Sequence, residues 1–136
     1  MASQDSKSSS ASAVAVNFQT IASDTTTVGT IIDSQGFESL IFSLVTATVT
    51  DGDYALILED GDDSGLSDAA TVTSTFLVGS LPAFTEDTDD NLSLDVGYIG
   101  KKRYVRASVV STNFSASGAV IGSMVMKGHK ASRPSA

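Results

Sequence analysis

The chain has 136 residues, a formal net charge of −8 at pH 7 and no cysteine. This length suits one domain with one hydrophobic core, and the lack of cysteine excludes disulfide bonds and thiolate metal sites. The apolar runs are too short to span a bilayer, and the first residues lack the apolar stretch of a secretory signal. We therefore expect a soluble protein that is made in a cytoplasm and does not bind a membrane.

The chain begins with a tract rich in serine and alanine, which cannot bury enough apolar surface to offset the entropy of ordering it. We therefore predict a flexible N-terminal arm over residues 1–12, one domain over residues 13–128, and a polar C-terminal tail over residues 129–136. We expect the arm to reach a partner outside its own domain.

Between the arm and the tail, apolar and polar residues alternate with a period of two, and turn residues interrupt the pattern often. This pattern predicts roughly seven or eight β-strands. They cover residues 13–20, 26–32, 38–50, 54–59, 70–78, 92–99, 103–111 and 118–127. No stretch has the apolar stripe of an amphipathic helix. The predicted fold is all-β, a single antiparallel two-sheet sandwich with either jelly-roll or immunoglobulin-like topology.

The strand predicted over residues 38–50 ends in an alternation of valine or alanine with threonine. Val45, Ala47 and Val49 are expected on the buried face. Asp51 and Gly52 follow at once, and both residue types accept the positive φ angles of a tight turn. The sequence therefore predicts a hairpin that pairs this strand with the next one.

Catalytic residue types are scarce. His129 is the only histidine, and it stands beside the polar tail, where a solvated surface residue is the simpler interpretation. A serine triad would need a better placed base, and paired carboxylates for sugar hydrolysis would lack a tryptophan platform. We expect no enzymatic activity and no cofactor.

One acidic stretch partly matches a calcium-binding loop. Asp60, Asp62, Ser64 and Asp68 occupy positions 1, 3, 5 and 9 of the loop template. Position 12 requires a bidentate glutamate, whereas this chain has Thr71 there, between flanks that are predicted strands. We interpret the stretch as a solvated loop and expect no metal.

The basic residues are concentrated late in the chain. All 16 Asp and Glu lie at or before Asp95, whereas seven of the 8 Lys and Arg follow Gly100, so residues 1–99 carry 1 − 16 = −15 and residues 100–136 carry +7. The candidate partner-binding residues are Lys101, Lys102, Arg103 and Arg106. Alternation in the strand over 103–111 turns Tyr104 and Arg106 outward, opposite to its valines.

Two interpretations of these bases stay open: a docking patch for an acidic partner, or a solvated sheet surface that balances nearby carboxylates of the same chain. The mixture of bases with Tyr104 is also found where proteins track nucleic acids. The strongly acidic remainder of the chain would repel a polyanion, so we expect no nucleic acid partner.

Four segments of the chain resemble a group of small structural proteins encoded among the head genes of tailed bacteriophages. They read IDSQGFESLIFSL, LILEDGDDSGLSDAATV, DVGYIGKKRYVRASV and GAVIGSMVMKGH and extend from about Ile32 to His129. The most specific pieces are GKKRYVR and DDSGLSDA. The end of the chain differs, because the group often has a stretch rich in proline and histidine after the Gly-His pair, which is absent here.

The resemblance implies a virion structural protein of β-sandwich type that decorates or cements the capsid. Its implied partners are the major capsid protein or other virion subunits and further copies of itself, at the capsid surface. Two alternatives stay open: a carbohydrate- or receptor-binding module with Tyr54, Tyr98 and Tyr104 as platforms, and a component of the head–tail junction or tail.

Overall fold

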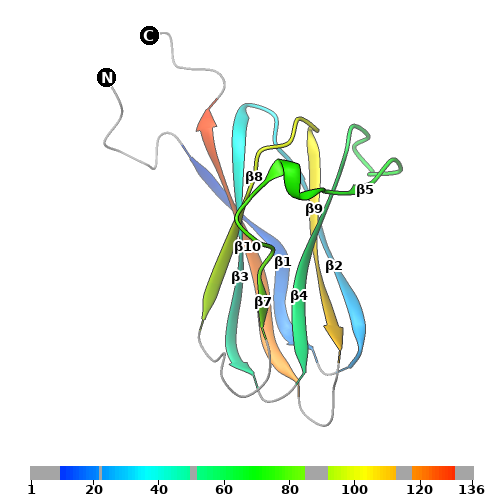
Figure 1. Ribbon diagram of the computed structural model, residues 1–136, viewed down its shortest axis with the longest axis vertical. Helices are drawn as coiled ribbons and strands as arrows, with labels where there is room; N and C mark the ends of the chain where they lie inside the picture. Colours follow the sequence, from blue (N-terminus) through cyan, green and yellow to red (C-terminus); the bar gives the residue numbers. More distant parts are fainter. Residues whose placement is uncertain (1–9, 22, 50–51, 85–91, 113–117, 131–136) are drawn as a thin grey trace.

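The structure is a computed structural model that describes residues 10–21, 23–49, 52–84, 92–112 and 118–130 (Figure 1). The described residues form ten strands, one short 3₁₀ turn (η1, Ser74–Phe76) and no α-helix. The described part of the chain therefore contains no helix long enough to cross a membrane. Seven strands have six or more residues: β1 (Ala11–Ile21), β2 (Thr25–Asp33), β3 (Phe37–Val49), β4 (Asp53–Gly61), β8 (Ser93–Tyr98), β9 (Tyr104–Thr112) and β10 (Ala119–Lys130). The other three have two residues each: β5 (Ala70–Thr71), β6 (Leu77–Val78) and β7 (Ala83–Phe84).

The strands form two antiparallel sheets, which confirms the predicted all-β sandwich. Sheet A has the order β1-β10-β3-β8-β6, and sheet B has the order β2-β9-β4-β5 with β7 also paired to β4. The pairs β1 with β10, β2 with β9, β3 with β8 and β4 with β5 are those of a long hairpin rolled into a barrel. The topology is thus a jelly roll, and the immunoglobulin-like alternative is wrong.

The core lies between the two sheets and contains side chains from every long strand. Along β9, Val105, Ala107 and Val109 are fully buried, as the alternation predicts, and they face sheet A. The core is also tied by Tyr54 of β4, whose hydroxyl donates a hydrogen bond to the carbonyl of Ile21 in β1 (3.2 Å). The first described strand begins at Ala11 and the last ends at Lys130, whereas most of the predicted arm (residues 1–12) and tail (residues 129–136) lies outside the described residues.

The predicted hairpin between β3 and β4 is wrong. The chain does reverse there, and Gly52 has a φ of 91°. However, β3 pairs with β10 and β8 in sheet A, whereas β4 pairs with β9 in sheet B. Turn residues specify that the chain reverses, but the burial of both strands decides whether they pair or pack face to face.

The predicted burial of β3 is wrong over part of its length. Leu40, Phe42, Leu44 and Thr46 face the core, whereas Val45 and Ala47 do not. A register shift against β10 follows Thr46, and it returns Val49 to the buried face. An extra residue at such a bulge reverses the alternation, so a pattern read from one end of the strand fails beyond it.

The segment 70–78 is not one strand. It pairs with β4 over Ala70–Thr71, turns through η1 and then pairs with β8 over Leu77–Val78. The segment therefore crosses from sheet B to sheet A at one edge of the sandwich.

Candidate interaction surfaces

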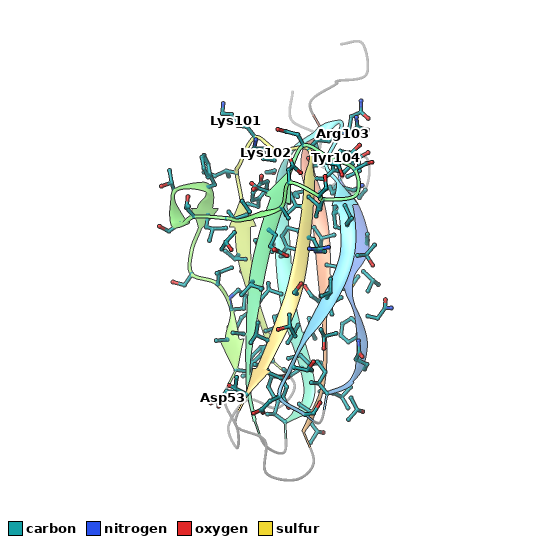
Figure 2. All side chains as sticks on the ribbon, turned by 90° about the vertical axis from the view of Figure 1, so that its right-hand side faces the viewer. Asp53, Lys101, Lys102, Arg103 and Tyr104 are labelled. Atoms are coloured by element: carbon teal, nitrogen blue, oxygen red, sulfur yellow. The ribbon has the colours of Figure 1, made fainter. Side chains whose placement is uncertain are left out.

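Three loops meet at one end of the sandwich, which we name the charged end (Figure 2). They are the β2–β3 turn (residues 34–36), the β4–β5 loop (62–69) and the β8–β9 loop (99–103). Jelly-roll pairing places β9 between β2 and β4, with Tyr104 opposite both Asp33 and Gly61, so the three loops leave the sheets side by side. Lys101, Lys102 and Arg103 all lie here, in the β8–β9 loop, whereas Arg103 was predicted to begin a strand.

Arg103 is held tightly by the β2–β3 turn. Its Nε and Nη2 donate to the two carboxylate oxygens of Asp33, both at 2.8 Å, and Nη2 also donates to Gln35 Oε1 at 2.6 Å. This two-pronged bond is the chief reason why the pKa of Asp33 is lowered to about 2. The hydroxyl and the N–H of Ser34 both donate to the carbonyl of Arg103 (2.7 and 2.8 Å), so the turn and the β8–β9 loop form one unit.

The β4–β5 loop is organised by its own carboxylates. Asp68 accepts hydrogen bonds from the N–H groups of Asp62 (2.9 Å) and Asp63 (3.2 Å), and Asp63 accepts from those of Gly65 (2.9 Å) and Ser67 (3.2 Å). These backbone donors lower the pKa of both Asp63 and Asp68.

Three of the four candidate calcium ligands in this loop, Asp60, Asp62 and Asp68, are engaged with different protein partners. Asp60 accepts from the hydroxyl of Tyr98 (2.7 Å), and Asp62 pairs with Lys102. Within the described residues, no group of three or more His, Asp or Glu is placed to hold a metal ion. The expectation that the loop binds no metal stays a prediction.

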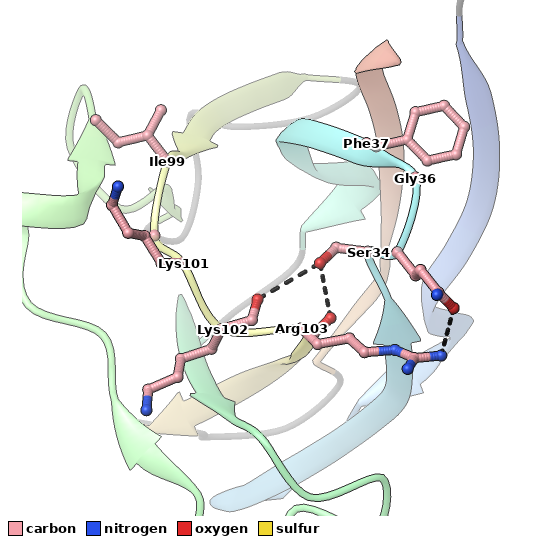
Figure 3. Close-up of a pocket in the computed structure, with 9 residues that line it drawn as sticks. Ser34, Gly36, Phe37, Ile99, Lys101, Lys102 and Arg103 are labelled. Atoms are coloured by element: carbon pink, nitrogen blue, oxygen red, sulfur yellow. Dashed lines mark hydrogen bonds between the residues drawn. The ribbon is translucent and has the colours of Figure 1, made fainter. Parts of the chain in front are cut away.

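The two lysines of the charged end differ in their partners. Lys102 Nζ lies 2.8 Å from Asp62 Oδ2, with both side chains well exposed, and this bond raises the pKa of Lys102. Lys101 is exposed and forms no ion pair with any of the described residues. Both line an open hollow of about 470 Å³ between the β2–β3 turn and the β8–β9 loop (Figure 3). In the same view, the side chains of the consecutive residues Lys102 and Arg103 extend in opposite directions.

Arg106 is separate from the other three bases. It lies along β9 on the outer side of sheet B, where its Nη2 donates to Glu59 Oε1 of β4 at 3.0 Å. The two side chains keep only 23% and 28% of their exposure, and Arg106 Nε is buried without a hydrogen-bond partner among the described residues. The structure therefore brings together Lys101, Lys102 and Arg103 but does not place Arg106 beside them.

Ion pairs within the chain join three of the late bases to carboxylates of the earlier, acidic part of the sequence. Three of the four candidate bases pair with carboxylates that precede them by 40 to 70 residues. The basic late segment and the acidic early segments are thus neighbours in sheet B. Whether the bases also meet a partner stays a prediction.

Two of the three tyrosines considered as sugar platforms are wrong for that role. Tyr54 and Tyr98 are almost fully buried, and burial together with the bond to Asp60 raises the pKa of Tyr98. Tyr104 is partly exposed, and the Arg103 guanidinium lies 5.0 Å from the centre of its ring.

Sequence reasoning missed a second surface, on the outer side of sheet A, which we name the apolar face. Residues that pair across a sheet point to the same side, and one such row runs Ser12, Met126, Ile41, Gly97 and Val78 from β1 to β6. The exposed apolar side chains of this face are Val14, Phe18, Ile41, Val78, Val120, Met124 and Met126.

The apolar face carries almost no charge. In its rows from Met126 to Val120, Asp95 is the one charged residue among those described. Phe18 lies over Gly122, where a Cβ atom would collide with its ring, so the glycine lets an aromatic side chain lie flat on the sheet. The segment GAVIGSMVM contained the signal, because it lacks charge on both faces of the strand.

No known protein family matches the sequence, and no curated protein matches it. Among solved structures, the fold is similar to the crystal structure of the SPBc2 prophage-derived protein YomS, at 15% sequence identity and a TM-score of 0.49. The match covers 86% of this chain and 91% of that chain. At this identity and score, the likeness carries no information about what this chain binds.

Proposed function

We propose that this chain is a non-enzymatic structural protein of a tailed-phage particle, which decorates or cements the capsid by binding capsid subunits and neighbouring copies. The observation that carries the proposal is the placement of the segments that resemble phage head proteins. The two most specific pieces, GKKRYVR and DDSGLSDA, are about 40 residues apart in the chain, yet they meet at the charged end through the bond between Lys102 and Asp62.

The charged end is well suited to contact a large partner. Its loops are fixed by the bonds of Ser34 and of Asp68, so little conformational entropy is lost when a partner binds. Lys101 is available for an acidic surface. A single exposed ion pair contributes only about 0.2–1 kcal/mol, so attachment would depend on many copies and several contacts in each copy.

The test replaces Lys101 and Lys102 together by serine and measures the number of copies on purified particles over a range of salt concentrations. We expect lower occupancy and a weaker dependence on salt than in the natural chain. The control replaces both residues by arginine, which keeps the charge and should keep the occupancy. Arg106 is left intact because its bond to Glu59 would mix attachment with stability.

Copy number separates the capsid role from the alternative of a head–tail or tail component. Copies distributed over the whole shell support decoration. A few copies at one vertex or in the tail would overturn the capsid role in favour of a head–tail or tail component. A serine variant with unchanged occupancy, in a protein that is absent from the shell, would overturn the capsid role as well.

A further inference from the structure

We infer that the apolar face is a self-association surface, on which a second copy of this chain packs with the same face in a symmetric pair. This pairing gives a surface to the contact between neighbouring copies that is part of the proposed function, but it is tested on the isolated chain, so it can fail while attachment to capsid subunits holds. It rests on the exposed apolar side chains of sheet A, on the charge of the whole chain and on the size of the face.

Large apolar side chains are exposed side by side on the apolar face. Met126, Phe18 and Ile41 keep 48%, 47% and 45% of their exposure, and Met124 and Val14 lie between them on neighbouring strands. Scattered apolar residues are normal on a surface, but a contiguous patch on a flat sheet usually marks a contact.

The net charge of the chain also favours contact through the apolar face. Each copy carries a net charge of −8, so two copies repel each other over most of their surfaces. The apolar face holds Asp95 as its one charge among the described residues, so it is the surface on which two copies can meet with the least repulsion. A strongly acidic partner would find no complementary charge there among the described residues, and a strongly basic partner would find Asp95 alone.

The area of the apolar face suits a weak pair. Four strands at about 4.8 Å spacing and seven residues at about 3.4 Å each give a face of roughly 19 Å by 24 Å, and β6 adds only two residues at its edge. Two such faces would bury on the order of 900 Å², which is the size of a weak, reversible contact. We therefore expect a reversible pair with a dissociation constant in the micromolar range or weaker.

Other parts of the chain do not match this face in composition. The segments outside the described residues are MASQDSKSS, TEDTDDN, NFSAS and ASRPSA, together with Ala22, Thr50 and Asp51. They are mostly polar or acidic, whereas an occupant of the apolar face must supply several apolar side chains. A second copy supplies them from the same sheet.

The experiment measures the mass of the isolated full chain by sedimentation velocity over a wide concentration range. The natural chain should shift from monomer to dimer, and added salt should strengthen the association because it screens the repulsion between acidic copies. An association between bases and carboxylates would weaken in salt, so a decrease with salt would overturn the inference.

Variants locate the contact. Met124→Glu, at the centre of the apolar face, should raise the dissociation constant by about tenfold or more, because it buries an unpaired charge. Met124→Gln should raise it less. The matched control is Val28→Glu on the outer side of sheet B, where the natural side chain is 59% exposed, and it should leave the association unchanged.

A second readout is the rate at which peroxide oxidises Met124 and Met126, which should fall as the protein concentration rises. Equal weakening by Val28→Glu and Met124→Glu would reject this face as the contact. A chain that stays monomeric at all concentrations while Met124→Glu lowers occupancy on particles would overturn the second copy as occupant and assign the face to a capsid subunit.

Discussion

The charged end and the apolar face differ in how far the chain satisfies its own exposed groups. At the charged end, Arg103 and Lys102 have carboxylate partners within the same chain, and backbone donors occupy Asp63 and Asp68. On the apolar face, Met124, Met126 and Ile41 remain exposed, and no apolar part of the described chain covers them. A run of charges in a sequence is conspicuous, but an uncharged sheet surface is the stronger structural sign of a missing partner.

Adjacent residues of β10 should differ sharply in their contribution to stability, because they lie on opposite sides of sheet A. Val125 faces the core with 1% exposure and Met126 faces solvent. Val125→Ala should lower the free energy of unfolding by about 2 kcal/mol, because it leaves a cavity, whereas Met126→Ser should change it by less than about 0.5 kcal/mol. Urea denaturation at low protein concentration measures both while keeping association out of the result. A large loss in Met126→Ser would mean that the outer face is part of the core.

The ion pairs of Arg106 and Lys102 should contribute differently to stability. Arg106→Met removes a partly buried pair and leaves Glu59 without its cation, so we expect a loss of about 1–2 kcal/mol in the free energy of unfolding. Lys102→Met removes a well exposed pair and should leave the melting temperature nearly unchanged. Thermal unfolding of the two variants tests this order, and equal losses would contradict it.

A substitution on the inner side of sheet A should stabilise the folded chain. Ser123 is fully buried on β10 between Val16 and Leu44, and its hydroxyl has no hydrogen-bond partner among the described residues. Ser123→Ala should therefore raise the free energy of unfolding by about 1 kcal/mol, since it removes an unsatisfied polar group. Denaturant unfolding measures the change, and a loss of stability would show that the hydroxyl has a partner.

Acid should remove the stability that carboxylates of the charged end contribute to the folded chain. The pKa values of Asp33, Asp63 and Asp68 are lowered in the folded chain, so these carboxylates stabilise it above their ordinary pKa. That contribution is lost as the pH falls from about 4 towards the pKa of about 2 held by Asp33. For the exposed Asp33 pair we expect a contribution of less than about 1 kcal/mol after solvent screening.

The measurement is the melting temperature of the natural chain and of Asp33→Asn between neutral pH and pH 2. The variant should start lower and lose less on acidification. Asp95→Asn, which changes the net charge by the same amount and removes no ion pair among the described residues, serves as the control at a protein concentration low enough to prevent association through the apolar face. A variant that follows the natural curve over the whole range would contradict the assignment.

The sequence by itself determined the fold class, the positions of seven long strands and the inward face of β9. These features depend on local alternation, which each strand carries in its own residues. The grouping of Lys101, Lys102 and Arg103 was also predictable, because three consecutive residues cannot lie far apart.

Tertiary structure decided which strands pair and which charges meet. Turn chemistry at Gly52 predicted a hairpin, but the rolled topology places β3 and β4 in different sheets and brings β9 between β2 and β4. The partners of Arg103 and Arg106 come from strands 70 and 47 residues earlier, a distance that no local pattern encodes. The apolar face likewise exists only once β1, β10, β3, β8 and β6 are aligned, because its residues are single positions on separate strands that share one side of a sheet.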